Sequence, residues 1–299
     1  MIDYRLLGPL EVAVNGHAVD IGGLKQRALL AILLLHANQP VQRDVLIDQL
    51  WAGHPPAGAE HAVEVYIWRL RKALESAAGG QCVLTRPGAY LLQAAEEQVD
   101  VARFERRAEA GRRALAAEDP GRAAADLGEA LALWRGPLLA DFRSEPFAQA
   151  EIARLEELRA GVVEDRIEAD LALGRHASVV SELEALVAVQ PLRERLHQQL
   201  MIALYRCGRQ GDALAVYQKA RRMLMADLGI EPGEPLRRLE RAILDQDPSL
   251  EPPPITRSSQ ALNPVDSSRP RHPAVVTARA VDSVAQQIGR ASCRERVWR

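Results

Sequence analysis

The chain has 299 residues, of which 47% are hydrophobic and 26% charged, and its formal net charge is −2. This size allows about two domains with ordinary cores, and the charge lends no support to nucleic-acid binding through overall basicity. The longest strongly apolar run, residues 28–35, is too short to span a bilayer, and the N-terminus lacks the pattern of a signal peptide. The three cysteines, Cys82, Cys207 and Cys293, match no zinc or disulfide spacing. We therefore expect a cytoplasmic protein without a membrane partner.

The first 37 residues predict a small sheet followed by a helix. Residues 2–21 alternate apolar and polar side chains around an Asn15-Gly16 pair, which is a strong hairpin signal. Residues 24–37 are apolar on nearly every side, as expected of a helix packed between a sheet and other helices. Lys25 and Arg27 begin this helix, and we expect them to be solvated, with phosphate contact as the alternative.

The next segment predicts a short amphipathic helix, a loop, a second helix and a hairpin. The first helix covers Arg43–Trp51, and the second includes the run His61–Glu75. One face of the second helix carries a stripe at helical spacing, which consists of Val63, Ile67, Leu70 and Leu74. Residues 82–92 then read as two strands around an Arg-Pro-Gly turn with Arg86 at its tip. This order of elements is that of a winged helix-turn-helix.

The opposite face of the second helix has an unusual composition: it carries His61, Val65, Trp68, Arg69 and Lys72, with Arg71 on its flank. Arginine and lysine can reach phosphates or guanine edges in the major groove of DNA, and Val65 can touch a thymine methyl group. The simpler alternative is a solvated surface helix with three basic residues. Residues 1–95 contain eight Lys/Arg and eight Asp/Glu, so the electrostatic argument depends on local clustering.

A different domain is predicted from about Val99 to Asp247, where turn residues interrupt long helical patterns. Residues 172–186 and 206–220 align at a spacing of 34, which superimposes Gly174 on Gly208. A 34-residue period with a central glycine is typical of tetratricopeptide-type helical hairpins. Stacked hairpins of this kind form surfaces for protein partners, not catalytic pockets.

The remaining sequence offers no chemistry of its own. Beyond about Pro248 the chain is rich in Pro and Ser and predicts a disordered tail, and its last residues, GRASCRERVWR, resemble cloning read-through. The sequence contains no P-loop, GxSxG, HExxH or paired CxxC. We therefore expect no enzyme, no catalytic residue, no cofactor and no metal site.

The run VEVYIWRLRKALE followed by LTRPGAYLL, together with the helical region behind it, resembles the Streptomyces antibiotic regulatory protein family over about residues 2–246. The resemblance implies a mainly α fold. A winged helix-turn-helix of α+β class would occupy residues 1–95. An all-α, tetratricopeptide-like bacterial transcriptional activation domain would occupy residues 98–246, ahead of a tail at 247–299.

The resemblance also implies roles for single residues. The DNA-reading helix of the family is here Ala59–Glu75, and its groove-facing positions are His61, Val65, Trp68 and Arg69. Arg71 and Lys72 match backbone-contacting positions, and Arg86 matches the wing. Trp68 departs from the family, which more often has a small, polar or basic residue there. Its indole either packs against a sugar or base edge or covers a neighbouring subunit.

Two functions remain open. The resemblance implies a transcriptional activator that binds direct repeats in promoter DNA as a homodimer, contacts RNA polymerase and controls a secondary-metabolite gene cluster. Such a protein would be cytoplasmic and associated with the nucleoid. The alternative is a tetratricopeptide-type adaptor whose winged helix binds protein instead of DNA, which the neutral charge balance of residues 1–95 allows.

Overall fold

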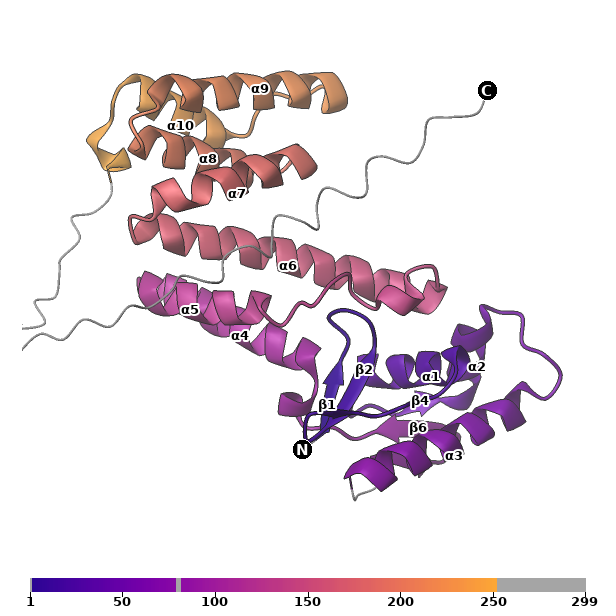
Figure 1. The fold of residues 1–299 in the computed structure, drawn as a ribbon. Coiled ribbons are helices and arrows are strands. Elements are labelled where there is room, and N and C mark those ends of the chain that lie inside the picture. Colours follow the sequence, from indigo (N-terminus) through magenta and orange to yellow (C-terminus); the bar gives the residue numbers. More distant parts are fainter. Residues whose placement is uncertain (1, 79–81, 252–299) are drawn as a thin grey trace, which may run out of the picture. The chain divides into compact units, whose positions relative to one another are not determined.

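The computed structural model describes residues 2–78 and 82–251, without the side chains of 76–78 (Figure 1). The chain begins with an antiparallel sheet of β1 (Ile2–Arg5), β2 (Glu11–Val14) and β3 (His17–Ala18), in the order β1-β2-β3. Ile2 lies opposite Val14, which in turn lies opposite His17. Asn15 and Gly16 have φ values of 50° and 84°, and both central residues of the favoured two-residue hairpin turn need positive φ. The predicted hairpin is confirmed.

The winged helix follows, with three helices and a second small sheet. Its helices are α1 (Leu24–Leu35), α2 (Arg43–Trp51) and α3 (Ala59–Ala78). Its sheet has the order β4-β6-β5 and consists of β4 (Val41–Gln42), β5 (Val83–Arg86) and β6 (Ala89–Leu92). The sequence had indicated every one of these elements except β4, whose two residues are too few to show alternation.

The predicted apolar stripe of α3 is buried. Val63, Leu70 and Leu74 are completely inaccessible to solvent, and Ile67 is 2% exposed. The helix starts after Gly58, whose φ of 85° lets the α2–α3 loop turn sharply into the first helical residue. Burial of this one face against α1 and α2 determines which side of α3 meets solvent.

The second part of the chain is helical (Figure 1). After a 3-10 turn at Glu96–Gln98, its elements are α4 (Asp100–Ala116), α5 (Pro120–Leu131), a 3-10 turn at Ala140–Phe142, α6 (Pro146–Ala172), α7 (His176–Val189), α8 (Glu194–Arg206), α9 (Gln210–Leu228), α10 (Glu234–Leu244) and a 3-10 turn at Pro248–Leu250. Gly174 and Gly208 both adopt left-handed φ, 75° and 76°, between successive helices. The aligned glycines therefore mark equivalent turns, and the predicted fold class is confirmed.

Two hydrophobic cores divide the described chain within α6. The first runs from Ile2 through the winged helix and α4–α5 to Ala169 near the end of α6, and the second runs from Ile167 to Ile243. Buried apolar side chains therefore continue across residues 95–98, where the sequence placed a domain boundary. That boundary, as a division between folding units, stays a prediction.

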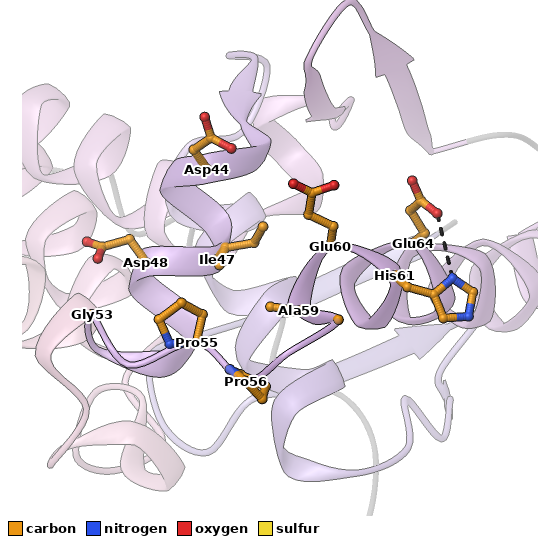
Figure 2. A pocket seen from close by; sticks show the side chains of 11 residues that line it. Asp44, Ile47, Asp48, Gly53, Pro55, Pro56, Ala59, Glu60, His61 and Glu64 are labelled. Atoms are coloured by element: carbon orange, nitrogen blue, oxygen red, sulfur yellow. Dashed lines mark ion pairs between the residues drawn. The ribbon is translucent and has the colours of Figure 1, made fainter.

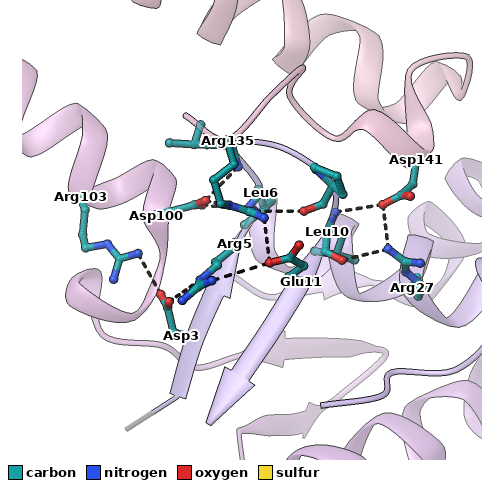
Figure 3. Close-up of polar contacts among 12 residues, drawn as sticks. Asp3, Arg5, Leu6, Leu10, Glu11, Arg27, Asp100, Arg103, Arg135 and Asp141 are labelled. Carbon is teal, nitrogen blue, oxygen red and sulfur yellow. Dashed lines mark hydrogen bonds and ion pairs between the residues drawn. The ribbon is translucent and has the colours of Figure 1, made fainter. Parts of the chain in front are cut away.

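Polar contacts also join the N-terminal sheet to the helical part (Figure 3). The carboxylate of Asp100, which is 2% exposed, accepts hydrogen bonds from the backbone N–H of Leu6 and Leu7 at 2.8–2.9 Å. Arg27 of α1 pairs with Asp141 at 2.7 Å. These contacts attach the segment after β1 to the start of α4, and α1 to the 3-10 turn before α6.

Regular structure continues a few residues beyond the point at which the sequence predicted the tail to begin. Residues 248–250 form a 3-10 turn, and the Leu250 carbonyl accepts a 2.8 Å hydrogen bond from Arg206 Nε. The tail prediction for residues 252–299, including the read-through at its end, falls outside the described residues. No helix within residues 2–78 and 82–251 is long and apolar enough to cross a membrane.

Candidate nucleic-acid interface

The face of α3 opposite its buried stripe is open to solvent. The side chain of His61 is 82% exposed and Trp68 is 60% exposed, while Arg69 and Lys72 are exposed and Val65 is half-buried. A tryptophan is rarely left this accessible in a folded chain, because its large apolar surface favours burial. The exposed indole therefore marks a surface suited to contact with another molecule.

Trp68 and Lys72 form a pair on this face. The Nζ atom of Lys72 lies 5.4 Å from the centre of the Trp68 ring, over the π system. This geometry is that of a cation–π interaction, which holds the ammonium group close to α3 without neutralising its charge. The pair therefore presents a cation beside a flat apolar surface.

The cations of α3 and the hairpin have no acidic partner among the residues that the structure describes. No carboxylate of the described residues lies within ion-pairing distance of Arg69, Lys72 or Arg86. Arg86 is exposed at the end of β5, next to the turn that joins β5 to β6. We call the exposed face of α3 together with Arg86 the α3–wing face. Its positive charge is uncompensated and can act on an anionic partner.

Arg71 is placed differently from its neighbours. Its side chain is half-buried, and its Nε donates a 2.9 Å hydrogen bond to the Val83 carbonyl. Its Nη2 donates a 2.7 Å hydrogen bond to Thr85 Oγ1. Thr85 carried no signal in the sequence, because only the folded hairpin brings it to α3. The assignment of Arg71 to a DNA phosphate stays a prediction.

An acidic pocket bounds the α3–wing face at the start of α3. It has a volume of about 830 Å³ and lies between α2, the α2–α3 loop and the first turns of α3 (Figure 2). Its acidic lining residues are Asp44, Asp48, Glu60 and Glu64. His61 lies at its rim, with Nδ1 3.9 Å from a Glu64 oxygen. Since carboxylates repel anions, this pocket is unfavourable for a negatively charged partner.

Two cations of α1 are not part of the interface. Lys25 Nζ donates to the Leu50 carbonyl at 2.5 Å, and Arg27 donates to the Leu10 carbonyl at 2.9 Å as well as to Asp141. The expectation that these side chains are simply solvated is therefore wrong. Folding of α1 against α2 and the N-terminal sheet gives both of them backbone acceptors that the sequence could not show.

Groups that could hold a metal are absent from the described part of the chain, in which no three His, Cys, Asp or Glu residues cluster suitably. Burial raises the pKa of the Asp100 carboxyl from its ordinary value of 3.8 to about 6, although the backbone hydrogen bonds from Leu6 and Leu7 act in the opposite direction. This carboxyl joins the segment after β1 to α4, and the residues that donate hydrogen bonds to it are not part of the α3–wing face.

An amphipathic helix with an uncompensated basic face, followed by a hairpin with an exposed arginine and then by helical hairpins, defines a winged-helix transcription regulator. A family model for the bacterial transcriptional activator domain matches residues 99–244. One described as the C-terminal part of transcriptional regulatory proteins matches residues 22–90. The chain belongs to the Streptomyces antibiotic regulatory protein family.

Similar proteins show how much of such regulators this chain spans. It is 40% identical to the regulatory protein DnrI of Streptomyces peucetius, over 84% of this chain and 94% of DnrI. It is 42% identical to the regulatory protein AfsR of Streptomyces coelicolor, over 83% of this chain but 24% of AfsR. The shared region is thus nearly all of one relative and a quarter of the other.

A solved structure agrees with the fold. EmbR of Mycobacterium tuberculosis, in complex with a low-affinity phosphopeptide, has a TM-score of 0.80 and 40% sequence identity with this chain. The match covers 83% of this chain and 66% of the EmbR chain. The arrangement of a winged helix ahead of helical hairpins therefore occurs in an independent structure of similar sequence.

Proposed function

We propose that this regulator activates transcription by binding promoter DNA through its α3–wing face. The observation that carries the proposal is that Arg69, Lys72 and Arg86 are all exposed and have no acidic partner among the described residues. Helix α3 would lie in the major groove, with His61, Val65, Trp68 and Arg69 toward the base edges. Lys72 would contact the phosphate backbone, and Arg86 would reach the adjacent minor groove or a phosphate.

The partners follow from the same arrangement. Two copies bound in the same orientation would occupy directly repeated sites, and we infer a homodimer on DNA. The helical domain would contact RNA polymerase. Large apolar residues are exposed where α7 and α9 end, among them Val189 at 78% and Leu228 at 53%. Membership of the Streptomyces antibiotic regulatory protein family supports a secondary-metabolite gene cluster as the target. The protein would work in the cytoplasm on the nucleoid.

Selection from random DNA tests this function without knowledge of the operator. The full chain is incubated with a random-sequence duplex library, and the retained duplexes are amplified and sequenced. We expect enrichment of one short element present twice in the same orientation. Affinity for the enriched duplex should then fall by orders of magnitude between about 50 and 200 mM salt, because several phosphates are contacted.

The adaptor function predicts the opposite result. A winged helix that binds only protein would enrich no sequence, and any weak DNA retention would show no preference for a repeated element. The acidic pocket at the start of α3 is the observation that favours this second function, because it places four carboxylates beside the basic face. Failure of the selection would therefore exclude DNA reading and leave the adaptor.

A further inference from the structure

Arg71 connects the DNA-facing helix to the hairpin that follows it. Its guanidinium group uses two different nitrogen atoms for two different residues of β5: Nε for the Val83 carbonyl at 2.9 Å and Nη2 for Thr85 Oγ1 at 2.7 Å. No carboxylate of the described residues is within ion-pairing distance of it. Both acceptors are neutral, so the contacts fix the side chain in place without cancelling its charge.

The two residues that Arg71 contacts lie on the open edge of the sheet. In the order β4-β6-β5, strand β5 has a neighbour on one side only. The Cys82 carbonyl accepts a hydrogen bond from Gln93 N, so that pair is bonded across the ladder. Because bonded and non-bonded pairs alternate in an antiparallel ladder, the backbone polar groups of Val83 and Thr85 point away from β6. Arg71 therefore binds to the outer edge of β5.

The other side of the hairpin is attached to α2. The Gly88 carbonyl accepts a 2.9 Å hydrogen bond from Arg43 N, and β4 pairs with β6 through Gln42 and Ala89. Gly88 has a φ of 67°, which suits the position after Pro87 in the turn. The hairpin is thus held on one side by the start of α2 and on the other by Arg71. Arg86 lies between these two attachments, directly after Thr85.

We propose that Arg71 is a positioning residue, which sets the orientation of the hairpin so that Arg86 meets the same duplex as α3. This inference rests on the proposed DNA binding and assigns Arg71 a role other than direct phosphate contact. When α3 is bound, contact by Arg86 is an intramolecular event whose strength depends on how well the hairpin is already oriented. A guanidinium can hold two acceptors in a fixed plane, whereas an ammonium group cannot span both.

Substitutions that leave the net charge unchanged distinguish a positioning role of Arg71 from direct contact with a phosphate. Arg71→Lys keeps the positive charge but loses the planar pair of donors, and Thr85→Val removes the hydroxyl acceptor while preserving a β-branched shape. We expect Arg71→Lys to weaken binding to the selected duplex by about tenfold, the effect of losing a charge-assisted hydrogen bond. Thr85→Val should weaken it severalfold. A direct phosphate contact predicts wild-type affinity for both variants.

A double-mutant cycle with Arg86 tests the coupling itself. If Arg71 acts through Arg86, the variant with both Arg71→Ala and Arg86→Ala should bind about as weakly as the worse of the two single variants. Independent phosphate contacts predict that the two losses multiply. Arg222→Ala, an exposed arginine of α9 without an acidic partner among the described residues, is the control and should bind as the wild type does.

Hydrogen exchange distinguishes failure of this inference from failure of the DNA-binding proposal. In the full chain without DNA, peptides covering β5 and β6 should exchange faster in Arg71→Lys than in the wild type, while peptides from α8 and α9 exchange equally. Unchanged exchange in the hairpin would overturn the positioning role even if DNA binds. Faster exchange in a chain that selects no duplex would contradict DNA reading, and with it the purpose assigned to Arg71.

Discussion

The arginines of the middle helices and those of the α3–wing face are in opposite electrostatic situations. Arg193 and Arg195, before and at the start of α8, pair with Glu164 of α6 at 2.8 and 3.4 Å, and Arg195 also pairs with Asp165 at 2.7 Å. Arg69 and Arg86 have no such partner among the residues that the structure describes. Similar side chains therefore stabilise the fold in one region and remain available for a partner in the other.

Because the two regions differ in burial, the loss of a charge partner has a different free-energy cost in each. The Glu164 side chain is 8% exposed, so its charge depends on the two arginines for compensation. A charge left alone in such a place costs several kcal/mol, whereas an exposed arginine costs almost nothing to the folded state. The comparison therefore predicts stability effects without binding effects in α6, and binding effects without stability effects on α3.

The largest stability effect is expected from Glu164→Ala. Loss of this buried carboxylate removes an acceptor from the half-buried side chains of Arg193 and Arg195, and the free energy of unfolding should fall by about 3 kcal/mol. Glu168→Ala is the matched control, because this residue also pairs with Arg195 but its side chain is 57% exposed. Its effect should stay below about 1 kcal/mol. Denaturant unfolding measures both, and equal losses would contradict the comparison.

Asp100 is a buried carboxylate that accepts hydrogen bonds from backbone N–H groups, whereas Glu164 accepts them from arginines. The pKa of Asp100, raised from 3.8 to about 6 by burial, means that the folded state binds more protons than the unfolded chain between these pH values. The stabilisation is therefore present below pH 3.8 and is lost as the pH rises through about 6. Each tenfold change in proton affinity is worth about 1.4 kcal/mol, so the loss amounts to about 3 kcal/mol.

Asp100→Asn isolates this effect because the amide does not titrate. The difference in unfolding free energy between wild type and variant should favour the wild type more at pH 4 than at pH 7. Unfolding in urea at a series of pH values measures that difference. A difference that stays constant over this range would show that Asp100 keeps an ordinary proton affinity in the fold.

Arg69→Ala tests the α3–wing face, where the comparison predicts a loss of binding without a loss of stability. If Arg69 reads a base, the variant should lose about 1–3 kcal/mol on the selected duplex and much less on random DNA, with unchanged unfolding. Fluorescence anisotropy with both duplexes measures the two losses. Equal losses on the two duplexes would reduce Arg69 to a phosphate contact, and Arg222→Ala should change neither affinity.

Periodicity allowed the sequence to predict most of the fold. The stripe of Val63, Ile67, Leu70 and Leu74 determined which face of α3 is buried, and the Asn15-Gly16 pair and the aligned glycines at 174 and 208 located turns. These signals are local, since each depends on residues within one or two turns of a helix or hairpin. Strand β4 carried no such signal and was missed.

Pairing between distant residues could not be predicted in the same way. Residues 1–95 contain equal numbers of acidic and basic residues, so the net charge of this segment gave no sign of the α3–wing face, which only the helical spacing indicated. In the fold, Glu60 and Glu64 line a pocket beside α2, whereas Arg69 and Lys72 point elsewhere. The bonds of Arg71 to β5 and of Asp100 to Leu6 likewise join segments that only the folded chain brings together. Charge counts therefore gave no indication of where the charge lies.

The central claim is that the uncompensated cations of the α3–wing face bind DNA phosphates. The most direct measurement is the slope of the logarithm of affinity against the logarithm of salt concentration, for the wild type and for a variant with both Lys72→Ala and Arg86→Ala. Each phosphate contact contributes about 0.9 to the magnitude of this slope, so we expect it to fall by about 2 in the double variant. An unchanged slope would contradict the account.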